Sequence, residues 1–230
     1  METASVRAAT PSRIVSPAVP GVRKPSYRNL LQGAYRRRTL TVWAMLFCTS
    51  AVGYGLLTWL PSLYRSSFHL SVEQSLRFGV VTSIMSPAGS LIGALLIDRL
   101  GRKACFTGAF LGAAVPMFVL WRMTAGQADP SPMLWLPAFA MFSISILLAG
   151  IYVYAPEVYP TTLRGLGVGA GSSFYRLAAI VSPTVIGWLL QKAGLATVFL
   201  ALGIVATAGA LVVVLFAMET RGRQLEELSG

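Results

Sequence analysis

Charged side chains are scarce in this chain, because only 12% of its 230 residues are Asp, Glu, Lys or Arg. Soluble domains carry about 25% charged residues, so a soluble core of this size would lack polar surface. Apolar runs of membrane-spanning length take the place of the missing charge, and the mean hydropathy is +0.66. The composition therefore excludes an ordinary soluble domain and predicts an integral membrane protein.

Chemically reactive residues are also rare, since the chain has two cysteines and one histidine. Cys48 and Cys105 lie in or beside apolar runs, and His69 lies in a predicted loop, so neither a disulfide framework nor a metal site is indicated. The glycine-rich run 165–171 lacks the spacing of a nucleotide-binding loop. The sequence, which shows no nucleophile–base pair, predicts no enzyme, no cofactor and no metal.

Six apolar segments are each about 18–25 residues long, which is enough for a helix to cross a bilayer core of about 30 Å. Their continuous apolarity favours helices, because barrel strands would alternate. We expect an all-α membrane protein with a basic, mostly disordered segment over 1–38, a six-helix bundle over 39–218 and a tail over 219–230. The predicted spans are Thr39–Leu63, Phe78–Ile97, Ala104–Trp121, Met133–Tyr154, Leu166–Leu190 and Leu195–Met218.

Basic residues set the predicted orientation. Most of the 19 Lys and Arg residues fall in the amino-terminal segment, in the loops after the second and fourth spans, and in the tail. Because Lys and Arg concentrate on the cytoplasmic side, both termini are predicted to be cytoplasmic. The net charge of +11 is therefore assigned to a membrane surface, and no nucleic-acid partner is expected.

Charged turns gather on this predicted cytoplasmic side. The turn Asp98–Lys103 joins two apolar runs, the segment Glu157–Gly165 joins two others, and the tail begins with Glu219 and Arg221. Partial dehydration at helix ends strengthens such pairs, so they could hold a bundle in one state and separate as it rocks. The alternative is that these charges only fix the topology of the helices, with their long side chains reaching to the membrane surface. The hypothetical latch contains Asp98, Arg99, Arg102, Glu157, Arg164, Glu219 and Arg221.

Four stretches, in this order and spacing, resemble the carboxy-terminal six helices of twelve-helix major facilitator superfamily transporters. They are Tyr54–Pro61, Asp98–Lys103, Pro156–Gly165 and Glu219–Glu227. Together they look most like the metabolite:proton symporters of the niacin and aromatic-acid type. The resemblance implies a secondary active transporter, or half of one, in the plasma (inner) membrane. It also implies alternating access and symport of an organic or aromatic acid with protons.

The resemblance leaves alternatives open. Sugar porters share the stretches at Pro156 and Glu219, although they carry glutamines where Cys48–Pro61 has none. A non-transporting membrane sensor or accessory protein derived from the same fold is the other alternative. In the resembled family the proton site lies in the amino-terminal half. The implied partners are the lipid bilayer, a small solute, protons and a second six-helix half, either a separate chain, a missing upstream region or a second copy.

One cation is predicted deep in a span. Arg176 follows Leu166 by ten residues, which places it about 15 Å into the helix. A charge at that depth is costly, so it marks a functional hypothesis, and its planar fork suits a carboxylate. The alternative is a structural anchor to backbone carbonyls or to Glu157. We expect Arg176 to face the bundle interior, and Tyr54 and Tyr152 are weaker candidates for the same solute site.

Small residues recur at the four-residue spacing that lets helices approach closely in lipid. Ordinary bundle packing is the expected role of all of them. The pairs are Gly89 with Gly93, Gly108 with Gly112, Gly165 with Gly169, and Gly167 with Gly171.

Overall fold

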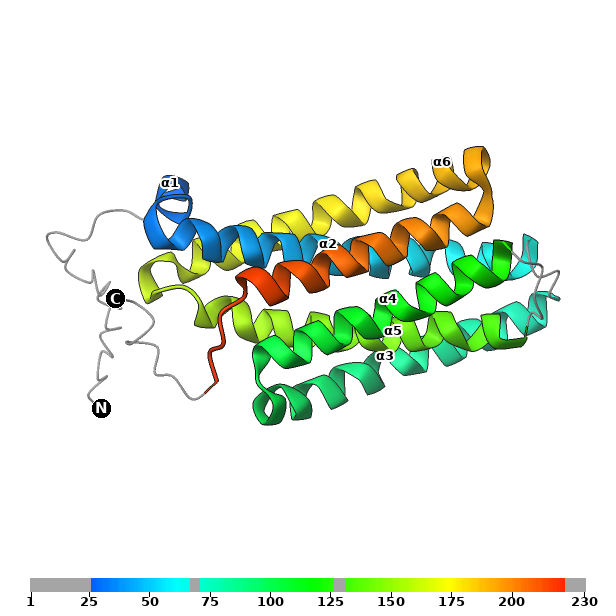
Figure 1. The fold of residues 1–230 in the computed structure, drawn as a ribbon, viewed down its shortest axis with the longest axis horizontal. Coiled ribbons are helices and arrows are strands. Elements are labelled where there is room, and N and C mark those ends of the chain that lie inside the picture. Colours follow the sequence, from blue (N-terminus) through cyan, green and yellow to red (C-terminus); the bar gives the residue numbers. More distant parts are fainter. Residues whose placement is uncertain (1–25, 67–70, 126–130, 222–230) are drawn as a thin grey trace, which may run out of the picture.

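The computed structural model describes residues 26–66, 71–125 and 131–221, and all regular structure in these ranges is α-helical (Figure 1). The all-α class predicted from the sequence is therefore confirmed for the described residues. The helices are α1 (Tyr27–Leu30), α2 (Gly33–Ser66), α3 (Val72–Leu100), α4 (Arg102–Ala125), α5 (Ser131–Glu157) and α6 (Thr161–Phe216).

In the described ranges, five helices are long and apolar enough to cross a membrane, where the sequence predicts six. The difference lies in α6, whose 56 residues contain one non-helical residue, Gly194, with φ 78° and ψ 176°. Figure 1 shows the chain reversing its direction there, so α6 runs out and back along the bundle. Glycine adopts a positive φ at little cost. The predicted spans Leu166–Leu190 and Leu195–Met218 correspond to the two arms of α6.

Helix α2 begins at Gly33, earlier than the expected boundary at residue 39, and the short helix α1 precedes it. The hydroxyl of Thr39 donates to the carbonyl oxygen of Leu30 at 2.9 Å, which fixes α1 against α2. The apolar pattern ends near Thr39, but arginine is a good helix former and extends α2 beyond the apolar span. Residues 1–25 and 222–230, which hold most of the predicted basic segment and tail, lie outside the described residues.

Interhelix hydrogen bonds to backbone carbonyls join α2 to the first arm of α6. The hydroxyl of Ser50 donates to Tyr175 O at 2.6 Å, and that of Ser182 donates to Ala51 O at 2.6 Å. The indole of Trp59 donates to the carbonyl oxygen of Pro183 at 2.9 Å. Pro183 itself lacks the N–H group that would continue the helix ladder. These contacts fix the rotation of α6, and with it the direction in which Arg176 points.

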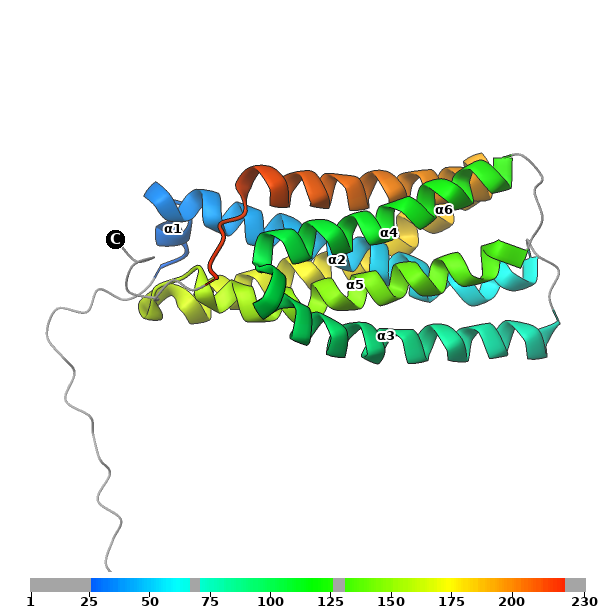
Figure 2. The same ribbon diagram turned by 60° about the horizontal axis from the view of Figure 1, so that its bottom comes forward.

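Helix α3 lies at one edge of the bundle in both views (Figures 1 and 2) and packs against α5 through glycines. A Cβ added to Gly89 would come within 2.3 Å of the carbonyl oxygen of Phe142, and one on Gly93 within 2.9 Å of Ile146 Cα. This pair therefore has the packing role expected of it. A Cβ on Gly108 would meet nothing within 4 Å, so the four-residue spacing alone does not identify a contact.

Candidate functional site

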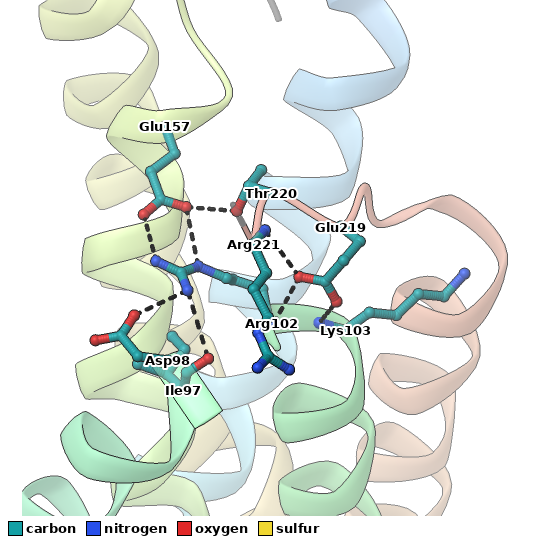
Figure 3. Close-up of polar contacts among 8 residues, drawn as sticks. All are labelled: Ile97, Asp98, Arg102, Lys103, Glu157, Glu219, Thr220 and Arg221. Atoms are coloured by element: carbon teal, nitrogen blue, oxygen red, sulfur yellow. Dashed lines mark hydrogen bonds and ion pairs between the residues drawn. The ribbon is translucent and has the colours of Figure 1, made fainter. Parts of the chain in front are cut away.

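A cluster of charged side chains joins several chain segments at one end of the bundle (Figure 3). Helix α3 ends there, α4 begins there, α5 ends there, and the chain that follows α6 passes beside them. We call Asp98, Arg102, Glu157 and Glu219 the charge cluster. Its members come from separate elements, so it forms only when these ends converge.

Arg102 is the centre of the charge cluster. Its Nε lies 3.2 Å from Glu157 Oε2 and its Nη2 lies 2.9 Å from Glu157 Oε1, which makes a two-point pair. Its Nη1 lies 2.9 Å from Asp98 Oδ1. The Arg102 side chain is 12% exposed, that of Glu157 23% and that of Asp98 73%. Solvent screens the pair with Asp98 much more than the pair with Glu157, so the latter is the stronger contact between elements.

Glu219 binds backbone rather than side chains. Its carboxylate accepts hydrogen bonds from the N–H groups of Arg102 at 2.9 Å, Lys103 at 3.0 Å and Arg221 at 3.1 Å. The first two are amides at the start of α4, which have no partner within the helix. Gly101, with φ 88°, brings the chain so close that a Cβ would lie 2.8 Å from Glu219 Oε2. Glu219 thus caps α4 from the opposite end of the described chain.

Two further contacts hold the segment after α6 against α5. The hydroxyl of Thr220 donates to Glu157 Oε2 at 2.5 Å, and the backbone N–H of Met218 donates to the hydroxyl of Tyr154 at 3.0 Å. Sequence reasoning did not single out Thr220, Tyr154 or Gly101 for this site. Thr220 lies in the stretch Glu219–Glu227 that carries the family resemblance, but no pattern in the sequence assigns it a contact with Glu157.

The other three residues of the hypothetical latch lie apart from these pairs. Arg99 is exposed and forms no ion pair or hydrogen bond through its side chain within the described residues. Arg221 contributes only its backbone N–H. Arg164, on α6, is half-buried, and its Nε is buried without a hydrogen-bond partner in the described part of the chain.

The candidate solute residues lie on the outer surface of the described bundle. Tyr175 contacts Tyr54 and Tyr152 edge-on, with ring centroids 5.9 Å and 6.5 Å apart. Tyr54 is 37% exposed and Tyr152 is 41% exposed. Arg176 is exposed and has no side-chain partner among the described residues. It therefore does not face the interior of this bundle, because the rotation of α6 turns it outward. Tyr175, which the sequence did not favour, joins the two predicted tyrosines.

The capping contact predicts a dependence of stability on pH. Burial acts to raise the pKa of Glu219, but the N–H groups of Arg102, Lys103 and Arg221 outweigh it and hold that pKa below its ordinary value near 4.5. The contribution of Glu219 to stability is thus complete above about pH 4.5 and is lost as the pH falls through the lower, folded-state pKa. Below about pH 4.5, we expect the melting temperature of Glu219→Gln to fall less steeply with decreasing pH than the melting temperature of wild type.

Glu73→Gln is the matched control for this measurement. Glu73 pairs with Arg77 at 2.6 Å, but both side chains are at least 75% exposed, and such surface pairs contribute little. The melting curve of Glu73→Gln across the acid range should follow wild type. If Glu219→Gln also follows wild type, the carboxylate does not stabilise α4.

The fold and the charge cluster define an integral membrane protein with a helical bundle fastened at one end by ionic contacts. Residues 14–230 match the family model described as "Sugar (and other) transporter". The chain belongs to this family of transporters, part of the major facilitator superfamily. The predictions of a major facilitator relationship and of a protein that is not an enzyme are confirmed.

Similar proteins include transporters named for different solutes. The niacin transporter NiaP of Acinetobacter baylyi is 33% identical over 94% of this chain and 48% of its own length. The cis,cis-muconate transport protein of the same bacterium is 24% identical over 79% of this chain and 43% of its own. Organic cation/carnitine transporter 7 of Arabidopsis thaliana is 29% identical over 86% and 41%. The chain spans less than half the length of each of these relatives.

A solved structure agrees with the fold. A crystal structure of a double-tryptophan mutant of XylE matches with a TM-score of 0.72 at 20% identity, over 82% of this chain and 41% of that one. The helical bundle therefore has the architecture of part of a major facilitator transporter.

Proposed function

We propose that this chain forms half of a secondary active transporter for small organic solutes. The observation that carries the proposal is the charge cluster, because it joins the ends of α3, α4 and α5 and the segment after α6 on one side of the bundle. Contacts of this kind can hold one orientation of a rocking bundle and break in the other. The two arms of α6 cross the membrane separately, which makes six crossings and returns the chain to its starting side. Both termini are then cytoplasmic, in the plasma (inner) membrane.

A second six-helix half is part of this proposal. The exposed tyrosines and Arg176 would line one wall of a central cavity that the second half closes, and relatives about twice as long support this arrangement. Within the described ranges the acidic residues Glu73, Asp98, Glu157 and Glu219 all lie at or near helix ends. If the second half is a separate chain or an upstream region, it supplies the titratable group for proton symport. If it is a second copy of this chain, the helix-end carboxylates of the two copies must serve instead.

A carboxylic acid is the proposed solute class. Arg176 supplies an exposed cation without a partner among the described residues, and the Tyr54, Tyr152 and Tyr175 rings supply faces and edges for a planar solute. Two of the similar proteins are named for niacin and cis,cis-muconate, which are both acids. A sugar is the second candidate, because the description of the family model names sugar.

A chimera tests the transporter function. Because NiaP of Acinetobacter baylyi is 33% identical over 94% of this chain, this chain can replace the matching half of NiaP. We expect cells with the chimera to take up labelled niacin, and uptake to fall when a protonophore removes the proton gradient. A folded, membrane-inserted chimera that moves neither niacin nor a sugar would support the sensor or accessory role instead.

Arg176 can be tested with a matched pair of ligands, niacin and its neutral amide, nicotinamide. We expect Arg176→Ala to weaken binding of niacin to the chimera by about tenfold or more, since a charge-assisted hydrogen bond to the carboxylate is lost. Nicotinamide binding should change by less than about twofold on the same reasoning. Arg176→Lys should keep part of the niacin affinity, because the charge remains while the planar fork is lost.

Calorimetry of both ligands with wild type, the two Arg176 variants and Lys192→Ala gives the readout. Lys192 is an exposed cation close to Gly194, away from the tyrosines, so its replacement should affect neither ligand. Equal losses of acid and amide in Arg176→Ala would mean that Arg176 only supports the structure.

A further inference from the structure

A groove with apolar walls and a basic rim lies between the start of α2 and the end of α6. Its volume is about 440 Å³, within the range of small-molecule sites. A second hollow of about 380 Å³ adjoins it and shares Arg37 and Phe216. The walls and rim of the groove include Arg36, Arg37, Leu40, Ala44, Val212 and Phe216.

The two arginines of the groove differ in how they are held. Arg37 donates to Leu215 O at 2.7 Å and its Cζ lies 5.3 Å from the centroid of the Phe216 ring, so its guanidinium is fixed at the rim with other N–H groups still available. Arg36 is exposed and has no ion pair or hydrogen bond through its side chain within the described ranges. No Asp or Glu is among the described residues that line either hollow. Among the described residues, the groove therefore presents positive charge above an apolar wall with no acidic side chain in its lining.

The position of the groove indicates what it faces. One candidate membrane span starts at Tyr35 and another ends at Phe216, so the basic rim lies at the level where hydrocarbon meets headgroups, and the apolar wall lies below it. Leu40 and Phe216 are both more than 40% exposed. An amphiphile with an anionic head and an apolar tail matches this arrangement, whereas a free ion would leave the apolar wall uncovered.

We propose that this groove binds an acidic phospholipid of the cytoplasmic leaflet. The headgroup phosphate accepts hydrogen bonds from Arg36 and Arg37, and an acyl chain lies along Leu40, Ala44 and Val212. Basic residues at a membrane surface attract anionic lipids, and the fixed guanidinium of Arg37 adds a geometric preference for phosphate. This groove shares no residue with the charge cluster or with the proposed solute residues, so lipid binding does not depend on transport, and only the choice of leaflet rests on the proposed orientation.

Native mass spectrometry of the full chain in detergent tests the proposal, with phosphatidylglycerol and phosphatidylcholine of identical acyl chains as probes. We expect wild type to retain one phosphatidylglycerol with a preference of roughly tenfold over phosphatidylcholine. In Arg36→Gln with Arg37→Gln this preference should fall to about twofold or less. The control removes two exposed cations elsewhere, as Arg28→Gln with Lys192→Gln, and should keep the preference of wild type.

A second variant keeps both cations and fills the groove instead. In Ala44→Phe, phosphatidylglycerol retention should fall although no charge has changed, because the acyl chain loses its place. The proposal is overturned if wild type binds both lipids equally, or if either groove variant keeps the preference. It is also overturned if glycerol 3-phosphate competes as well as the lipid does, since the groove would then bind only the phosphate.

Discussion

A chain in which leucine replaces Gly89 is expected to lose its bundle or to melt at a much lower temperature. Any Cβ at this position would lie 2.3 Å from the carbonyl oxygen and 3.0 Å from the carbonyl carbon of Phe142. These are backbone atoms of α5, so no side-chain rotation relieves the overlap and the two helices must separate. We expect a loss of about 3 kcal/mol or more, measured as the melting temperature in detergent by tryptophan fluorescence.

Gly108→Leu is the matched control, because the same change is made on α4 at an exposed position where a Cβ meets nothing within 4 Å. Leucine has a higher helix propensity than glycine, so this variant should melt at or slightly above the wild-type temperature. If both variants lose the same stability, the close approach of α3 to α5 is not the cause.

The second large effect is expected for Arg102→Ala. This change removes both ionic contacts of Arg102 and leaves the Glu157 carboxylate, 23% exposed, with only the Thr220 hydroxyl as a described partner. Removing one member of a buried ion pair costs about 3–5 kcal/mol, and partial exposure places this variant near the lower figure. A shift of roughly 2–4 °C per kcal/mol then predicts a melting temperature lower by about 10 °C.

Transport measurements distinguish a gating role of the charge cluster from a purely structural role. If the charge cluster holds one state of the bundle, the NiaP chimera carrying Arg102→Lys should insert and fold, yet transport more slowly, because the two-point contact with Glu157 is lost while the charge stays. Asp98→Asn should have a smaller effect, since the Asp98 side chain is 73% exposed. Wild-type uptake rates in both variants would show that the cluster only anchors the helix ends.

The sequence predicted the membrane class well, because helices that face lipid must have few charges and long apolar runs. It also predicted which helix ends carry charge. It did not predict the pairs, since Arg102 meets Glu157 only when α4 and α5 converge with particular rotations. Glu219 was predicted as a charge in an ionic latch, but its partners are backbone N–H groups, which no residue pattern reveals.

Depth and direction are separate properties of a helical residue, and Arg176 illustrates the difference. Counting along the span gives its depth, but the contacts that rotate α6, such as Ser182 with Ala51, decide that it points outward. The early start of α2 was missed for a similar reason. Apolar runs mark where a helix enters lipid, whereas Gly33 marks where this helix begins.

The cap on α4 has a consequence for the timing of synthesis. Glu219 lies 117 residues after Arg102, and ribosomes add about 5–20 residues per second. The first turn of α4 therefore remains uncapped for roughly ten seconds, until Glu219 has been synthesised, and its amides are open to other acceptors in that time. Any nascent chain halted within this interval carries an incomplete helix end at the membrane surface.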